Sequence, residues 1–182
     1  MKSQKIQLFI LLICLIVFAS GYFGLKAYNK RAEAKESEPR YTALSISENT
    51  DVTSLKVVNS NGEFEVVKDG EEWKFKDSDE DIDEDKLAKK INCIKGITSD
   101  QIIEKADNLA DYGLDNPSII ITASLSDGSS HKIKVGSYNS AANKYYLSVD
   151  DDSVVYTVDS SIHTNYQFTL DEIKTKADNK ND

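Results

Sequence analysis

The sequence predicts an α+β protein, in which an N-terminal transmembrane helix precedes two antiparallel β-meanders of about three and four strands, each followed by a short helix. Three observations predict this class. An uncharged apolar run occupies residues 6–25, apolar and polar residues alternate with period two through much of the remaining chain, and helically spaced apolar residues follow each alternating stretch. Period-two alternation places one face of a strand in a core and the other face in water.

The leader, IQLFILLICLIVFASGYFGL, has twenty residues and no charged side chain, and we expect it to be a membrane anchor. About 20 apolar residues in a helix cross ~30 Å of hydrocarbon. The alternative is a cleaved signal peptide, whose apolar region usually spans ~7–15 residues and ends at small residues such as Ala19, Ser20 and Gly21. The run continues to Leu25, which favours an anchor. Cys14 follows large apolar residues, unlike the cysteine of a lipoprotein acylation site.

The anchor divides the chain into predicted regions. These are a cytoplasmic tail at residues 1–5, the transmembrane anchor at 6–25, a charged stalk at 26–40, an extracytoplasmic α+β domain at 41–175 and a disordered tail at 176–182. Basic residues flank the anchor about equally, so the positive-inside rule does not decide its orientation. A short tail, one span and a large polar remainder are typical of a signal anchor. We therefore expect a single-pass protein of the bacterial cell membrane whose C-terminal domain is extracytoplasmic.

The charge of that domain excludes one class of partner. All 31 acidic residues follow residue 32, whereas five of the 22 basic residues lie at or before Arg31, so the remainder carries a formal net charge of −14. Such a domain is repelled by nucleic-acid phosphates. We expect no nucleic-acid binding. Only Cys93 remains for this part of the chain, so no internal disulfide framework is expected.

The first meander is predicted from three short alternating runs and two turns. The strands centre on Leu55–Val57, Phe64–Val66 and Trp73–Phe75, and the turns are the Asn-Gly hairpin NSNG at residues 59–62 and Asp69-Gly70. Both residues of an Asn-Gly turn tolerate positive φ. A helix beginning near Asp83 follows, and it carries Leu87, Ile91 and Ile94 on one face, with Cys93 well off that face.

The second meander begins after a punctuated turn. Residues 109–112 are predicted to form a short helical turn ended by Gly113, and Pro117 bars its continuation. Four strands are then predicted over Ile119–Leu125, Ile133–Val135, Tyr145–Val149 and Val154–Val158. Ser160 or Ser161 caps a final short helix that contains Ile162 and Tyr166. On this interpretation the motif YGLDNP ends a helix and starts a strand, and it is structural rather than catalytic.

No catalytic, cofactor-binding or metal-binding residue is predicted. The acidic run at residues 77–86 fails the EF-hand pattern, because Ile82 or Glu84 replaces the required glycine and Ala88 or Lys90 replaces the glutamate. Asp150, Asp151 and Asp152 are predicted to form a solvated turn. His131 is expected at the rim of its strand, and no G-x-S-x-G elbow accompanies it or His163. The glycines form no nucleotide-binding loop. We therefore predict a non-enzymatic protein without cofactors.

Two alternatives remain open at this point. Asp111 and Asp115 are the carboxylates that an extracytoplasmic enzyme acting on envelope glycans would use, and glycoside chemistry would require the pair to face one cleft. Tyr146 is the aromatic residue expected on the outer face of its strand, whereas Tyr145 points to the core with Leu147. Tyrosine combines an apolar face with a polar tip, so Tyr146 or the acidic turns would serve a glycan- or metal-binding module.

The chain resembles the bacterial domain-of-unknown-function 4340 family over about residues 41–175. The resemblance rests on the segments SLKVVNSNGEFEVVKDGEEWKF, LADYGLDNP, LSDGSSHKIKVG and KYYLSVDDDSVVYTV. The resemblance implies a bacterial membrane-anchored, extracytoplasmic domain. It also implies that some members accompany ABC transporters of the gliding-motility kind. No catalytic residues carry over. The expected partners are thus the lipid bilayer, through residues 6–25, and an ABC transporter or envelope complex, with the domain as an accessory or interaction module of unknown biochemical activity.

Overall fold

The computed structural model describes residues 18–29 and 41–175. The chain consists of two units, residues 1–38 and 39–182. In the first unit, residues 18–29 are helical and expose large apolar side chains, among them Phe18 and Phe23. The predicted tail at 1–5, anchor residues 6–17, stalk residues 30–40 and the tail at 176–182 lie outside the described residues. Within the described part of the chain, no helix combines the length and the apolar character needed to cross a membrane.

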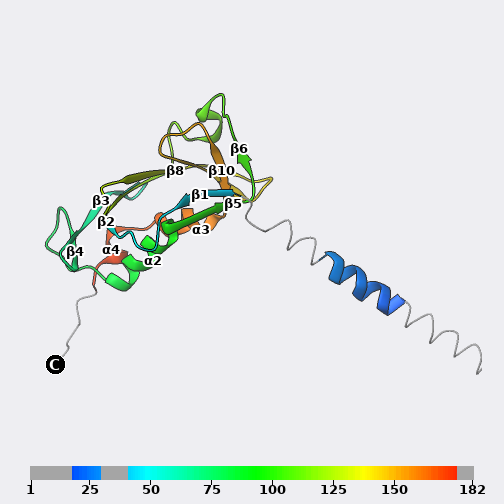
Figure 1. The fold of residues 1–182 in the computed structure, drawn as a ribbon, viewed down its shortest axis with the longest axis horizontal. Helices are drawn as coiled ribbons and strands as arrows, with labels where there is room; N and C mark the ends of the chain where they lie inside the picture. Colours follow the sequence, from blue (N-terminus) through cyan, green and yellow to red (C-terminus); the bar gives the residue numbers. More distant parts are fainter. Residues whose placement is uncertain (1–17, 30–40, 176–182) are drawn as a thin grey trace, which may run out of the picture. The chain divides into compact units, whose positions relative to one another are not determined.

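The second unit is α+β, with a mostly antiparallel sheet (Figure 1). Its strands are β1 (Tyr41–Ser45), β2 (Val52–Asn59), β3 (Gly62–Asp69), β4 (Glu72–Phe75), β5 (Gly96–Ser99), β6 (Ile102–Ile103), β7 (Ile119–Leu125), β8 (Ser130–Asn139), β9 (Lys144–Val149) and β10 (Val155–Val158). Its helices are α2 (Glu84–Lys95), the 3₁₀ helix η1 (Leu109–Tyr112), α3 (Ser160–Tyr166) and α4 (Leu170–Ile173).

Both predicted meanders are confirmed, but they form one sheet rather than two. The order of its eight strands is β4-β3-β2-β7-β8-β9-β10-β6, so the meanders join where β2 pairs with β7. Leu55 lies opposite Ala123 in this pairing, and Val57 lies opposite Ile121. The sequence did not predict β1, β5, β6 or α4. These elements have two to five residues, too few to establish a clear period, and β1 and β5 form a separate two-stranded sheet.

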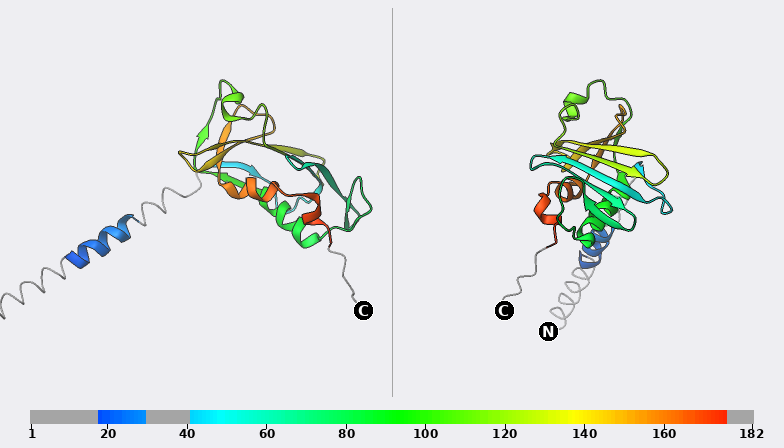
Figure 2. Two further views of the ribbon diagram at one scale, coloured as in Figure 1. Left: turned by 180° about the vertical axis from the view of Figure 1, so that it is seen from behind. Right: turned by 90° about the vertical axis from the view of Figure 1, so that its left-hand side faces the viewer.

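One face of the large sheet carries the main core. Helices α2, α3 and α4 and the β1–β5 pair lie along this face (Figures 1 and 2). The buried residues contributed by the central strands are Leu55, Val57, Ile119, Ile121, Ala123, Leu125, Ile133 and Val135, and those contributed by the helices are Leu87, Ile91, Ile94, Ile162, Tyr166 and Ile173. The predicted apolar face of α2 is confirmed. Its N-terminus is also where expected, because Asp83 caps the helix by accepting a hydrogen bond from the Lys86 amide.

The hairpin at residues 59–62 is confirmed, but its predicted turn geometry is wrong. The two loop residues are Ser60 and Asn61, and neither has a positive φ, whereas Gly62 (φ 135°) already pairs with Asn59 in the ladder. The Asn59 side chain accepts a hydrogen bond from the Asn61 amide at 2.7 Å and donates two, to the carbonyls of Tyr166 and Phe168. This side chain therefore shapes the turn and fixes it to the link between α3 and α4, a partner more than 100 positions away in the chain.

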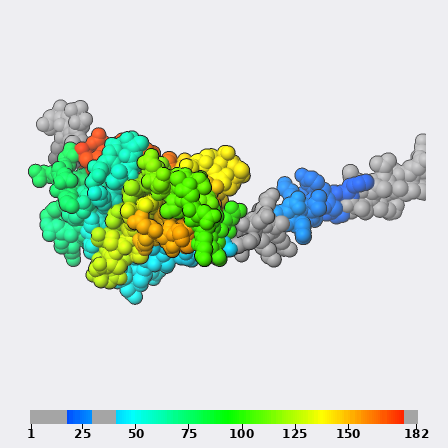
Figure 3. Space-filling view, turned by 90° about the horizontal axis from the view of Figure 1, so that it is seen from above, coloured from blue at the N-terminus to red at the C-terminus, as the bar shows by residue number. Residues whose placement is uncertain are grey.

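The opposite face of the sheet is partly covered by the segment that contains η1 (Figures 2 and 3). Gly113 ends η1 in the left-handed conformation, at φ 69°, as predicted. Leu114, the next residue, is fully buried yet lies outside the main core cluster. Its side chain packs on Gly136 of β8. The motif YGLDNP therefore ends η1 and also holds the segment that contains η1 against the outer face of the sheet.

Candidate functional site

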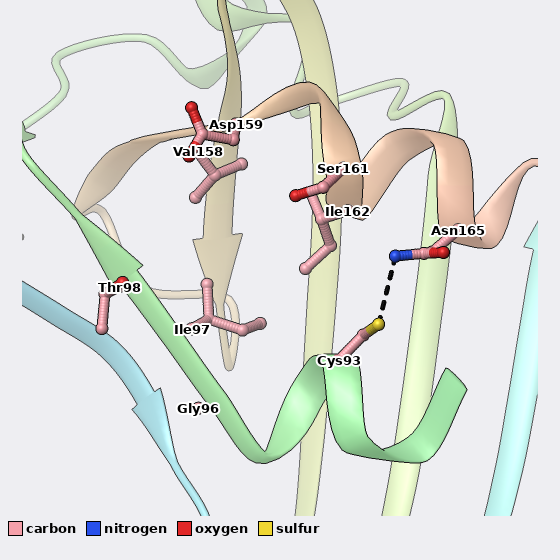
Figure 4. A pocket seen from close by; sticks show the side chains of 9 residues that line it. All are labelled: Cys93, Gly96, Ile97, Thr98, Val158, Asp159, Ser161, Ile162 and Asn165. Atoms are coloured by element: carbon pink, nitrogen blue, oxygen red, sulfur yellow. Dashed lines mark hydrogen bonds between the residues drawn. The ribbon is translucent and has the colours of Figure 1, made fainter. Parts of the chain in front are cut away.

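A cavity of about 290 Å³ opens where α2, β5, β10 and α3 meet (Figure 4). Cys93 projects into it from the last turn of α2, and Ser161 and Asn165 project from α3. Ile97 and Ile162 supply apolar wall. The cavity exists because β5 begins immediately after α2 and then runs beside β1, which holds the end of α2 close to α3.

Hydrogen bonds and burial set the chemistry of this cavity. The Asn165 amide donates to the Cys93 sulfur at 3.1 Å (Figure 4). Burial raises the pKa of the Cys93 thiol, so the neutral form persists. The thiolate is the nucleophilic form of cysteine. The backbone carbonyl of Asn165 accepts a hydrogen bond from Lys90, whose pKa is lowered by burial and whose ammonium lies 3.8 Å from the centre of the Phe168 ring. Cys93 is thus a half-buried boundary residue, as predicted from its position off the apolar face.

A second cleft, of about 380 Å³, lies at the β6 end of the sheet, and we call it the Tyr146 cleft. Its walls include Tyr41 of β1, Asp100 and Gln101 between β5 and β6, Asn139 of β8, Tyr146 of β9 and Thr157 of β10. The cross-strand pairing of β9 with β10 sets Tyr146 beside Thr157. The cleft therefore combines residues from five segments of the chain, and it contains the aromatic residue that the strand pattern assigns to the outer face.

Tyr145 and Tyr146 point to opposite faces, as the alternation of β9 requires. Tyr145 packs against the main core and stacks on His163, with ring centroids 4.2 Å apart and planes 10° apart. Tyr146 instead packs against Tyr112 in a T-shaped arrangement, with ring centroids 4.9 Å apart and planes at 78°, and its hydroxyl accepts a hydrogen bond from the Asn139 side-chain amide at 2.7 Å. The residues of the η1 segment thus form part of the surroundings of the cleft.

Several residues of the acidic run after β4 make contacts that connect it to α2 and to the C-terminal end of the domain. Glu80 and Asp171 both pair with Lys174, and Ile82 is buried and bridges to Lys174 through the backbone. Asp83 caps α2. The run borders a cavity of about 620 Å³ beside Trp73. In the described ranges, His, Cys, Asp and Glu side chains form no group of three or more with the spacing to hold a metal ion.

The second acidic segment forms a tight turn between β9 and β10. Asp150 and Asp151 both adopt positive φ, at 56° and 58°. The Asp150 carboxylate accepts a hydrogen bond from the Lys132 amide and pairs with the His131 ring nitrogen Nδ1, each at 2.8 Å. Asp151 pairs with Lys132 and with Lys134, and its hydrogen bonds to these lysines, Lys134 first, lower its pKa. The carboxylates thus fix the turn to β8, and His131 occupies the rim position predicted for it.

The two carboxylates of the enzyme alternative have local roles. Asp111 accepts a hydrogen bond from the side chain of Asn108, the residue that caps η1. Asp115 accepts one from the amide of Asn116. Both side chains are exposed, and neither lines the Cys93 cavity or the Tyr146 cleft. Among the described residues, no carboxylate forms an ion pair with His163, and burial lowers the pKa of this imidazole.

Sequence reasoning singled out Tyr146 and Cys93 but missed their neighbours. Asp100 and Gln101 line the cleft with Tyr146 because β10 pairs with β6 on one side and with β9 on the other, and Asn139 reaches Tyr146 through the pairing of β8 with β9. Asn165 meets Cys93 only because α3 packs on α2. No local pattern marks these polar residues, since each follows an ordinary strand or helix end. Their partners are 7 to 72 positions away in the chain.

Comparison with known proteins gave one match. A family model described as "Domain of unknown function (DUF4340)" matches residues 76–178. The match begins after β4, so the first meander lies outside it, although the resemblance had been expected from about residue 41. No curated protein matches the chain. No solved structure matches it either.

Proposed function

The chain belongs to the DUF4340 family, and on that premise we propose that it is a single-pass bacterial membrane protein whose extracytoplasmic domain is a non-catalytic interaction module. The uncharged run at residues 6–25 supports the anchor, since it has the length of a membrane-spanning helix. The net charge of −14 after Arg31 supports a domain that stands away from anionic lipid headgroups and nucleic acid. Residues 1–5 would remain in the cytoplasm.

The observation that carries the non-catalytic part is the structural engagement of the reactive side chains. Burial raises the pKa of the Cys93 thiol, and its sulfur accepts a hydrogen bond from the Asn165 side-chain amide. His131 pairs with Asp150, and His163 stacks on Tyr145. A nucleophile or general base needs a partner within hydrogen-bond reach and a free position facing substrate. These groups instead hold turns and helices in place, which suits a domain that recognises a partner.

Protease shaving of intact protoplasts tests the topology. With an epitope placed after Asp182, external protease should remove the epitope while a cytoplasmic control protein survives. Mass spectrometry of the membrane fraction should find a chain that still contains residues 6–25. Survival of the epitope would reject the extracytoplasmic placement. A product beginning near Gly21 or Tyr22 and recovered from the medium would reject the anchor.

An ABC transporter or envelope complex is the partner class that we propose. The test is chemical crosslinking in intact cells, followed by affinity capture of the tagged chain from detergent-solubilised membranes. Transporter subunits should co-purify with the full chain. They should not co-purify with a matched chain that keeps residues 1–40 and carries an unrelated domain in place of residues 41–175. Equal recovery with both chains would show that the anchor alone, and not the domain, accounts for the association.

A further inference from the structure

We propose that the Tyr146 cleft binds a neutral saccharide. This inference rests on the proposed function, because polymeric envelope glycans are accessible to an extracytoplasmic domain. The volume of about 380 Å³ lies within the ~300–1,000 Å³ of typical small-ligand sites.

Contacts within the domain hold the aromatic wall of the cleft in place. The Tyr146 ring is held by the Tyr112 ring on one side and by the Asn139 amide at its hydroxyl. Asn139 is itself fixed, because its side-chain oxygen accepts the amides of Ala141 and Ala142 at 3.0 and 3.1 Å. Tyrosine offers a sugar an apolar ring for its C–H face at little entropic cost. Tyr41, 40% exposed, provides a second ring at the mouth of the cleft.

The polar groups beside these rings can form hydrogen bonds with the hydroxyl groups of a sugar. The backbone at Gln101 is held on both sides, since its amide donates to the Ser99 hydroxyl and its carbonyl accepts the Thr157 amide. The Gln101 side chain is exposed and makes no hydrogen bond to the described residues. An amide both donates and accepts, as vicinal hydroxyls do. Asp100, which accepts a hydrogen bond from the Thr157 hydroxyl at 3.3 Å, adds an acceptor on a fixed backbone.

Charge selects a neutral saccharide over an acidic one. Lys144 lies 3.3 Å from Asp100 and 2.9 Å from Asp159, so one ammonium is shared between two carboxylates. These three side chains therefore carry a formal net charge of −1. An anionic glycan would be repelled by this excess, whereas a neutral sugar needs only the hydrogen bonds and the rings.

The test uses the full chain in lipid nanodiscs, which avoids sugar-based detergents. Chitotetraose, cellotetraose, maltotetraose and mannotetraose are titrated to about 10 mM while amide resonances are followed by NMR. At least one should bind saturably and shift the amides of residues 100–103 and Tyr146. Gln101→Ala and Tyr41→Ala, both at exposed side chains, should each raise the Kd roughly tenfold. Tyr138→Ala is the control, because this exposed tyrosine does not line the cleft.

Three results would overturn the proposal. These are an absence of saturable binding for all four sugars, binding unchanged in both variants, and shifts that map outside the cleft. A preference for tetra-alanine or for an oligogalacturonate over the neutral sugars would overturn it as well, since it would assign the cleft to a peptide or an acidic glycan. The titration does not depend on topology in the cell, so failure here and failure of protease shaving are separate outcomes.

Discussion

Gly136 of β8 lies directly against the backbone carbonyl of Tyr112 at the end of η1. A β-carbon at position 136 would approach the Tyr112 oxygen to well under 3.0 Å, and it would also crowd the Leu114 side chain. The reciprocal approach is equally close, because a β-carbon at Gly113 would collide with Ser137. The glycines of two separate motifs, YGLDNP and KVG, are therefore explained by a single contact between the η1 segment and the sheet.

Gly136→Ala should destabilise the domain through this contact. The backbone of the η1 segment must move to admit a methyl group, and such overpacking costs about 1–3 kcal/mol. Urea denaturation followed by the fluorescence of Trp73, the single tryptophan of the chain, measures the free energy of unfolding. The matched control is Gly96→Ala, where nothing lies within 4 Å and φ is −145°. Equal effects of the two substitutions would contradict the contact.

Leu114→Ala tests the small core on the outer face of the sheet. Leu114 is fully buried there, and truncating a buried leucine to alanine costs about 2–5 kcal/mol. Leu109→Ala is the control in the same segment. Leu109 is only half-buried, so this substitution should lower the stability clearly less. Thermal unfolding by circular dichroism measures both. If Leu114→Ala unfolds at the same temperature as the parent chain, then the segment is not anchored by this side chain.

Tyr166→Phe tests the link between α2 and α3. The Tyr166 hydroxyl is buried and donates to the Lys90 carbonyl at 2.6 Å, and burial raises the pKa of this hydroxyl well above 10.0. Removing one partner of a buried hydrogen bond costs about 1–3 kcal/mol. Tyr138→Phe removes an exposed hydroxyl that donates to Asn143, and it should change stability by less than about 0.5 kcal/mol. A larger loss of stability for Tyr138→Phe than for Tyr166→Phe would contradict the role of the Tyr166 hydroxyl in linking α2 to α3.

His163 should make the domain less stable in mild acid. Burial lowers its pKa below 6.5, so the unfolded chain takes up the proton more readily than the folded chain does. The contribution of neutral His163 to the free energy of unfolding is therefore fully present above the pKa of this histidine in the unfolded chain. It is lost as the pH falls through the lower pKa of His163 in the folded chain, with a slope of at most about 1.4 kcal/mol per pH unit.

His163→Phe keeps a ring for stacking on Tyr145 and removes the titration. Urea denaturation at a series of pH values between 7 and 5 (a window set by the ordinary histidine pKa) should show a shallower decline for this variant than for the parent chain. His131→Asn, at the rim histidine that pairs with Asp150, is the control and should retain the contribution of His163. A parallel decline for the parent and His163→Phe chains would count against burial as its cause.

Much of the fold was predictable because the main elements are long enough to show a period. The inward residues of β7 and the apolar face of α2 were predicted residue by residue. The predicted turn at Asp69-Gly70 also occurs, with Gly70 at φ 66°. The turn at residues 59–62 was predicted in place but not in geometry, because the Asn59 side chain bonds to a distant helix link. The residue preferences of local turns cannot indicate that Asn59 will bond to Tyr166 and Phe168.

Less of the candidate site was predictable. The strand pattern placed Tyr146 outward, but it did not indicate that Asn139 and Gln101 would lie beside it. The Cys93 cavity was missed for the same reason, since it forms between α2 and α3. The partners of Cys93, His131 and His163, which are Asn165, Asp150 and Tyr145, are also distant in the chain, and they meet only in the folded state.

The sequence by itself determined the alternation that sorts each strand into an inner and an outer face, the apolar face of α2, and the positions of the main turns. These follow from local periodicity and from the conformational freedom of single residues. The tertiary structure alone decided that two meanders form one sheet, that Gly136 lies against Tyr112 and Gly113 against Ser137, and which polar groups surround Tyr146. The physical reason is that strand pairing and close backbone approach depend on the steric fit between segments distant in the chain, which neighbouring residues do not encode.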